Sequence, residues 1–115
     1  MKNNHINYIE FKANDLDKIK QFYSGAFNWS FTDYGPDYIA FSESGLDGGF
    51  ERAEEDVVNG ALVVLYHERL QEVKAKIEQM GGRISRDIFE FPGGFRFHFV
   101  DPSGNELGVW SETNN

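Results

Sequence analysis

One helical pattern occurs twice in this chain. The first copy reads Asp15-Leu16-x-x-Ile19-x-x-Phe22-Tyr23-x-x-x-Phe27, and the second reads Leu70-x-x-Val73-x-x-x-Ile77-x-x-Met80-Gly81-Gly82. Corresponding positions, such as Leu16 and Leu70, are 54 residues apart. An internal repeat predicts two similar units, and a unit of about 55 residues would be only marginally stable alone. We therefore expect two halves that share a sheet or core, with the functional site between them.

Apolar patterning around the repeat predicts the same order of elements in each half. Alternating residues predict strands, and apolar residues three and four apart predict helices. Asn14-Asp15 is the expected N-cap of the first helix, and Gly81-Gly82 is the expected end of the second. The expected strands are 6–12, 29–32, 38–42, 49–52, 61–66, 83–85, 95–100 and 106–110, and the expected helices are 16–27 and 68–80.

The segments between these elements have the composition of turns and linkers. The acidic run 51–60 is the expected linker between the halves, 89–94 is read as a link that contains a turn, and 101–105 as a tight turn. The chain is therefore predicted as one α+β domain, 1–115, built from two βαβββ units. We place the first module at 1–55 and the second at 56–115.

Composition excludes several classes of function. The formal net charge of −8 would repel a nucleic-acid backbone. Because the chain has no cysteine, it has no disulfides, thiolate nucleophiles or cysteine-bound metal. No apolar run approaches the roughly 20 residues that a membrane span requires, and the first residues lack the apolar core of a signal peptide. We therefore expect a cytoplasmic protein without nucleic-acid or membrane partners.

Four segments carry a resemblance to a known superfamily. They are EFKANDLDKIKQFYSGAFNW (10–29), GGFER (48–52), the second helix with its Gly81-Gly82 end, and FRFHFVDPSGNELGVW (95–110). Together they resemble the vicinal oxygen chelate superfamily, also called the glyoxalase, bleomycin-resistance and extradiol-dioxygenase superfamily. The resemblance implies two βαβββ modules whose curved mixed sheets form a cup, with the helices outside. It also implies a homodimer and a metal ion or small ligand inside the cup.

The resemblance gives expected positions for metal ligands. Metal-dependent members carry His or Glu early in the first strand of each module, and these positions are Tyr8 and Leu62 in this chain. They carry Glu late in the last strand of each module, and here those positions are Glu51 and Gly108. Only Glu51 is a usual ligand of divalent cations. We therefore expect no tightly bound metal and no other cofactor.

Few other polar residues are candidates for chemistry. Glu10 shares a strand face with Tyr8, so it either enters the cup or is solvated. His98 alternates with its Phe neighbours and is either a structural histidine or a catalytic base. The candidate ligand-binding residues are Tyr8, Glu10, Tyr38, Leu62, Val64, Phe97, His98 and Trp110. The sequence leaves open which face of each strand lines the cup.

These residues predict a small-molecule-binding protein with an incomplete metal site. An apolar, aromatic cup with one or two carboxylates suits an aromatic or cationic organic ligand. The alternative is a metal-dependent lyase or isomerase of glyoxalase type, in which Glu51 is the base or a metal ligand. A third alternative is a structural or protein-interaction module whose cup is filled by its own Phe side chains.

Overall fold

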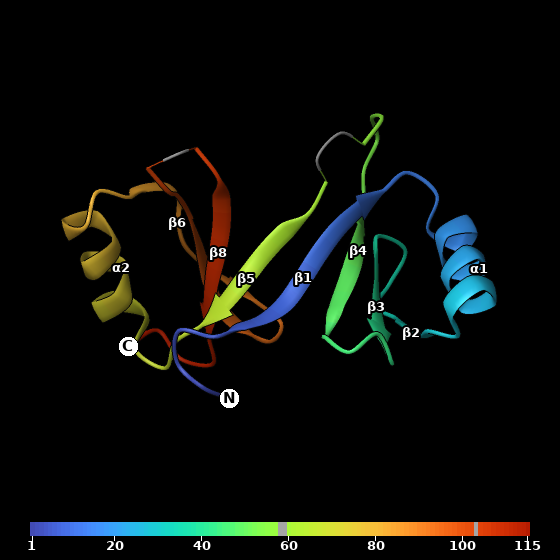
Figure 1. The fold of residues 1–115 in the computed structure, drawn as a ribbon, viewed down its shortest axis with the longest axis horizontal. Coiled ribbons are helices and arrows are strands. Elements are labelled where there is room, and N and C mark those ends of the chain that lie inside the picture. The colour runs from blue at the N-terminus through green and yellow to red at the C-terminus, as the bar shows by residue number, and fades with distance from the viewer. Residues whose placement is uncertain (58–59, 103) are drawn as a thin grey trace. The chain divides into compact units, whose positions relative to one another are not determined.

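The computed structural model describes residues 1–57, 60–102 and 104–115 and has an α+β fold (Figure 1). The predicted order of strand, helix and three strands, repeated once, is confirmed in these ranges. The elements are β1 (Ile6–Ala13), α1 (Leu16–Phe27), β2 (Ser30–Asp33), β3 (Tyr38–Ser42), β4 (Gly48–Arg52), β5 (Leu62–Tyr66), α2 (Leu70–Gln79), β6 (Arg83–Phe91), β7 (Gly94–Val100) and β8 (Glu106–Ser111). No helix in the described ranges has the length and apolar character of a membrane span.

The chain divides into two compact units. The N-terminal unit is Tyr8–Leu62, and the C-terminal unit is Val63–Asn115 together with Met1–Asn7. The first residues belong to the C-terminal unit because the backbone N–H of Asn4 donates to the Tyr66 carbonyl at 2.8 Å.

In the N-terminal unit the strand order is β2-β3-β4-β1, with β1 parallel to β4 and the other pairs antiparallel. One face of this sheet packs against α1 through a core of Ala13, Leu16, Ile39, Phe41 and Phe50. Because side chains alternate along a strand, the neighbours of these core residues point to the other face. We call the sheet face opposite the helix of a unit its open face.

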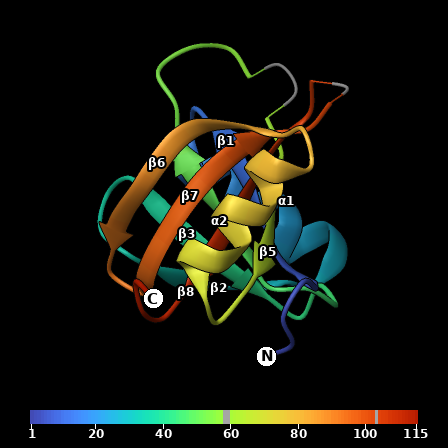
Figure 2. The ribbon, with the colours of Figure 1, turned by 90° about the vertical axis from the view of Figure 1, so that its left-hand side faces the viewer.

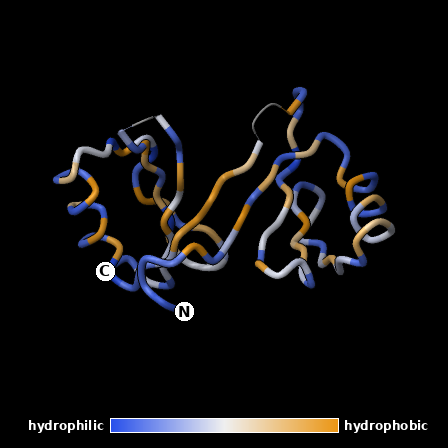
Figure 3. Tube along the Cα trace, in the orientation of Figure 1, coloured by the Kyte–Doolittle hydropathy of each residue, from blue (hydrophilic) through white to orange (hydrophobic). Residues whose placement is uncertain are grey.

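In the C-terminal unit the order is β5-β8-β7-β6, with β5 parallel to β8 and the other pairs antiparallel. Figure 2 shows α2 lying against this sheet. The core between them contains Leu70, Phe97 and Val109, which are at most 2% exposed. Along the trace, hydrophilic and hydrophobic residues alternate in both helices, as expected for helices with one buried face (Figure 3).

Each unit contains an ion pair at equivalent positions of the repeat. Lys20 Nζ of α1 lies 2.7 Å from Asp33 Oδ1 of β2, and Lys74 Nζ of α2 lies 2.6 Å from Asp87 Oδ1 of β6. Both members of the second pair are 54 residues after those of the first. Each pair joins the helix of its unit to the following strand, so the repeat is also present in the tertiary structure.

The predicted helix and turn signals are confirmed. The Asp15 carboxylate caps α1 by accepting the Lys18 N–H at 3.1 Å. At the end of α2, Gly81 takes the left-handed conformation with φ of 100°, which glycine adopts without strain. Asp101 accepts from the Asn105 N–H at 3.0 Å and from its side-chain amide at 2.9 Å.

One boundary prediction is wrong. The segment 83–85 was predicted as a short strand and 89–94 as a link, whereas β6 runs from Arg83 to Phe91. The pairing of β6 with β7 shifts register between Ile84 and Arg86 and again between Arg86 and Phe89. These shifts interrupt the alternation of apolar and polar residues from which a strand is predicted. Parts of the predicted linker and turn, Val58, Asn59 and Ser103, lie outside the described residues.

Candidate functional site

Two tyrosines and a glutamate are hydrogen-bonded on the open face of the N-terminal unit. The hydroxyl of Tyr8 is bonded to the hydroxyl of Tyr38, and the Tyr38 hydroxyl donates to Glu10 Oε1 at 3.1 Å. Tyr38 lies across β4 because Gly49 has no side chain: a Cβ there would be 2.3 Å from the Tyr38 hydroxyl oxygen. The sheet thus brings together three of the predicted ligand-binding residues.

The electrostatics of this cluster keep Tyr38 protonated. Burial, the hydrogen bond with Tyr8 and the charge of Glu10 all raise the pKa of Tyr38. A protonated phenol remains a hydrogen-bond donor at neutral pH. Glu51, the candidate catalytic residue, lies opposite Tyr38 in the β3–β4 ladder and is exposed. The open face of this unit therefore presents two phenol rings and two carboxylates.

The residues at the expected metal-ligand positions do not fit a divalent-metal site. Tyr8 has its oxygen hydrogen-bonded to Tyr38, Leu62 and Gly108 have no side-chain donor, and Glu51 is the one carboxylate of the four positions. Within residues 1–57, 60–102 and 104–115, no group of three or more His, Cys, Asp or Glu could hold a metal ion.

The strand registers show which positions of the two units are equivalent. Glu10 lies opposite Gly49, and Val64, which is 54 residues after Glu10, lies opposite Gly108. Gly49 and Gly108 are therefore equivalent, and Glu51 lies two residues further along its strand. The equivalent of Glu10 in the C-terminal unit is thus an aliphatic residue.

On the open face of the C-terminal unit, aromatic rings and guanidinium groups alternate. The guanidinium carbon of Arg86 lies 3.6 Å from the centre of the Phe89 ring. The guanidinium carbon of Arg96 lies 5.3 Å from the Phe89 ring and 5.7 Å from the Phe91 ring. Phe91 in turn meets the Trp110 ring at 6.2 Å. This face is aromatic like the predicted cup, but it carries positive charge.

His98 lies in this surface with its ring largely buried. Its ring contacts Phe89 at 5.8 Å between centroids, and its Nδ1 lies 3.9 Å from Glu106 Oε2. Among the described residues, its Nε2 is buried without a hydrogen-bond partner, which typically costs about 1–3 kcal/mol. Burial, together with the charge of Arg96, lowers the pKa of His98 to about 4. The imidazole is therefore neutral at physiological pH.

The remaining predicted residues divide between core and surface. Val64 and Trp110 point to the open face of the C-terminal unit, because Leu65 and Val109 beside them face α2. Val64 is only 1% exposed, so like Phe97 it has almost no surface for a ligand. Phe97 is 0% exposed and packs in the core with Leu70. It therefore has no surface left for a ligand, and we leave it out of the site. Phe95 and Phe99 lie on the same core side of β7, whereas Arg96 and His98 lie on the open face.

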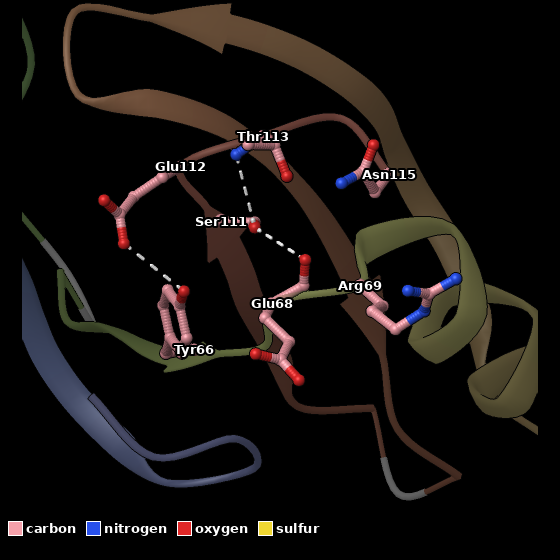
Figure 4. Close-up of a pocket in the computed structure, with 7 residues that line it drawn as sticks. All are labelled: Tyr66, Glu68, Arg69, Ser111, Glu112, Thr113 and Asn115. Atoms are coloured by element: carbon pink, nitrogen blue, oxygen red, sulfur yellow. Dashed lines mark hydrogen bonds between the residues drawn. The ribbon is translucent and has the colours of Figure 1, made fainter.

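A polar pocket that the sequence did not indicate lies where β5 and β8 end and α2 begins (Figure 4). Its volume is about 420 Å³, and its lining includes Tyr66, Glu68, Arg69, Ser111 and Glu112. The Tyr66 hydroxyl donates to Glu112 Oε1 at 3.4 Å, and Ser111 Oγ donates to the Glu68 carbonyl at 3.3 Å. Only the fold brings the end of β8 beside the start of α2, so no short motif marks this pocket.

Family comparison agrees with the resemblance seen in the sequence. The glyoxalase/bleomycin resistance protein/dioxygenase superfamily matches residues 5–109. The chain belongs to this superfamily. No match was found among curated proteins.

Solved structures share the fold at low sequence identity. A hypothetical protein from Bacillus halodurans C-125 has a TM-score of 0.78 at 9% identity, covering 99% of this chain and 98% of that one. The methylmalonyl-CoA epimerase of Streptomyces coelicolor, in complex with 2-nitronate-propionyl-CoA, has a TM-score of 0.73 at 14% identity, covering 98% and 99%. The Mn(II)-bound glyoxalase of Novosphingobium aromaticivorans has a TM-score of 0.72 at 20% identity, covering 98% of this chain and 40% of that one. At these identities the likeness shows the fold alone.

Proposed function

We propose that this protein binds a small organic ligand, aromatic or cationic, and that its metal site is incomplete. The observation that carries the proposal is the hydrogen-bonded cluster of Tyr8, Tyr38 and Glu10. Tyr8 and Glu10 lie in β1, the strand in which metal-dependent relatives are expected to carry a first ligand, and Tyr38 reaches them from β3. A phenol whose oxygen is already hydrogen-bonded is a poor replacement for that ligand.

The same cluster has the chemistry of a cation site. Aromatic rings attract cations through their faces, and a nearby carboxylate adds charge complementarity. Here Tyr8 and Tyr38 supply the rings, while Glu10 and the exposed Glu51 supply the charge. Two of the similar structures are named as holding Mn(II) and a CoA derivative. The complex with the CoA derivative supports the proposal that a protein of this fold binds a small organic molecule.

Binding of benzyltrimethylammonium, which carries both a ring and a permanent cation, tests this proposal. We expect it to raise the melting temperature, because a ligand that binds the native state stabilises it. Glu10→Gln and Tyr38→Phe should reduce this shift, whereas Glu55→Gln, which makes the same charge change on an exposed residue elsewhere in the unit, should not. Equal shifts in all variants would contradict the proposed site.

The enzymatic alternative has its own test with the same assay. If the protein is a metal-dependent lyase or isomerase of glyoxalase type, Ni²⁺, Zn²⁺ or Mn²⁺ should stabilise it, and Glu51→Ala should abolish the effect. Glu51 is accessible enough for this role, since it is exposed beside Tyr38. Stabilisation by organic ligands alone would favour the binding protein.

We also propose a cytoplasmic homodimer, in keeping with the sequence expectations. The oligomeric state is checked by light scattering coupled to gel filtration, where a monomer at micromolar concentration would contradict it. The two-module organisation of the single domain, 1–55 and 56–115, remains part of this proposal.

A further inference from the structure

The open face of the C-terminal unit has a chemistry unlike that of the N-terminal unit. Its most unusual group is His98, whose Nε2 is buried without a hydrogen-bond partner among the described residues. Buried polar atoms are nearly always satisfied, and an exception calls for a functional explanation. Gly108 lies next to the ring, and a Cβ there would be 3.4 Å from His98 Cδ2.

The surroundings of the neutral His98 imidazole favour its proton on Nδ1 and leave Nε2 without one. Nδ1 lies 3.9 Å from the carboxylate of Glu106, which attracts a proton to that side of the ring. The charged groups near the imidazole are Arg86, Arg96 and Glu106, and the two arginines disfavour a second proton. With Nδ1 protonated, Nε2 has a free lone pair and accepts a hydrogen bond.

Arg86 and Phe89 come from β6, the strand beside His98, and the Phe89 ring contacts the imidazole. Arg86 lies opposite His98 in the β6–β7 ladder, and its exposed side chain stacks on Phe89. Within the described ranges, the Arg86 guanidinium has no carboxylate partner. An exposed cation–π stack is weak compared with the cost of an unpaired buried nitrogen. A ligand that displaces the stack and satisfies the imidazole therefore gains free energy.

We propose that this face binds a planar aromatic anion that donates an O–H or N–H group to His98 Nε2. The ring of the ligand stacks on the rings of this face, where Phe89 contacts His98 and Phe91 contacts Trp110. Its anionic group pairs with the Arg86 guanidinium. A cationic ligand is disfavoured here, because Arg86 and Arg96 lie over the same rings. The inference shares with the proposed function only the premise that an open face binds a small organic molecule.

Affinities for four small probes test the ligand class by calorimetry on the full chain. We expect 3- or 4-hydroxybenzoate to bind about tenfold more tightly than benzoate, which lacks the donor, or phenol, which lacks the charge. Arg86→Gln should weaken both acids about fivefold, while Arg69→Gln, the same change outside this face, should leave them unchanged. His98→Gln should abolish the preference for hydroxybenzoate over benzoate.

A measurement on the unaltered protein covers the case in which His98→Gln fails to fold. The ¹⁵N chemical shift of His98 Nε2 should move on addition of hydroxybenzoate, while those of His5 and His67 should not. Equal affinities for hydroxybenzoate and benzoate would overturn the inference. So would affinities for these two acids that Arg86→Gln leaves unchanged. If benzyltrimethylammonium binds and the acids do not, the inference fails and the proposed function stands. If only the acids bind, the inference stands and the cation site at Tyr8, Tyr38 and Glu10 fails.

Discussion

The two units both pack aromatic rings against their helix, but they differ in the rings that their open faces carry. In the N-terminal unit the rings pack between the sheet and α1, at Phe11, Tyr23, Trp29, Phe41 and Phe50. In the C-terminal unit Phe95, Phe97 and Phe99 lie among aliphatic residues on the helix side, and further rings, Phe89, Phe91 and Trp110, lie on the open face. The two copies of the repeat therefore differ in which sheet faces carry aromatic side chains.

This difference separates rings that stabilise the fold from rings available to a ligand. Rings packed against a helix bury apolar area and add pairwise contacts with each other. Rings on an open face contribute less to the core and keep surface for binding. The open face of the N-terminal unit instead carries the hydrogen-bonded pair of Tyr8 and Tyr38 with Glu10.

The largest effect is expected from truncating one core ring in each unit. Phe50→Ala and Phe97→Ala each remove a ring that is at most 3% exposed, and each should cost about 3–5 kcal/mol of unfolding free energy. Phe50 should be the more costly, because Phe11, Tyr23 and Phe41 lie within 5.7 Å of its centroid. Denaturant titration measures both, and Phe22→Ala, on a 57% exposed residue, is the control. A larger loss of unfolding free energy for Phe97→Ala than for Phe50→Ala would contradict the expected difference between the two cores.

The buried histidine of the C-terminal unit should make stability depend on pH. The pKa of His98 is about 4 in the folded protein, against 6.5 in the unfolded chain. Between these values the unfolded state binds a proton that the native state does not, so stability is full above about pH 6.5 and falls as pH drops towards about 4. The loss should reach at most about 3 kcal/mol. In denaturant titrations at several pH values, His98→Gln should remove this pH dependence of the unfolding free energy, and His5→Gln should not. The same pH dependence in both variants would contradict the assignment to His98.

The two equivalent glycines should respond differently to alanine. At Gly49 a Cβ would lie 2.3 Å from the Tyr38 hydroxyl oxygen, so Tyr38 must move, and we expect a loss of about 1–3 kcal/mol. At Gly108 the nearest atom would be His98 Cδ2 at 3.4 Å, which allows a change below about 1 kcal/mol. Thermal unfolding compares the two variants. Equal losses would show that Tyr38 is not held across β4 as described.

The smallest effect is expected where the two units agree. Asp33→Ala and Asp87→Ala each remove one of the repeated helix-to-strand ion pairs. Both aspartates are largely exposed, so each variant should be destabilised less than Gly49→Ala in denaturant titration. The loss for Asp87 should shrink in acid, because the hydrogen bond from Lys74 lowers the pKa of Asp87. A loss as large as that of Gly49→Ala would show that the pairs contribute more than surface ion pairs do.

Much of the fold was predictable because its signals are local. Apolar spacing predicted α1, the Asp-Pro turn signal predicted the contact of Asp101 with Asn105, and glycine predicted the end of α2. The length of β6 was not predictable, because its two register shifts break the alternation. The sequence placed Tyr8 and Glu10 on one strand face, but their hydrogen bonds with Tyr38 depend on the strand register and on Gly49.

The sequence by itself determined the repeat and the order of elements, since both follow from residue spacing along the chain, and its motifs resembled the superfamily to which the chain belongs. The tertiary structure decided which face each side chain occupies: Phe97 went to the core, while His98 was left on the open face with an unsatisfied nitrogen. The physical reason is that β7 has large side chains at successive positions. Only packing against α2 distinguishes its two faces.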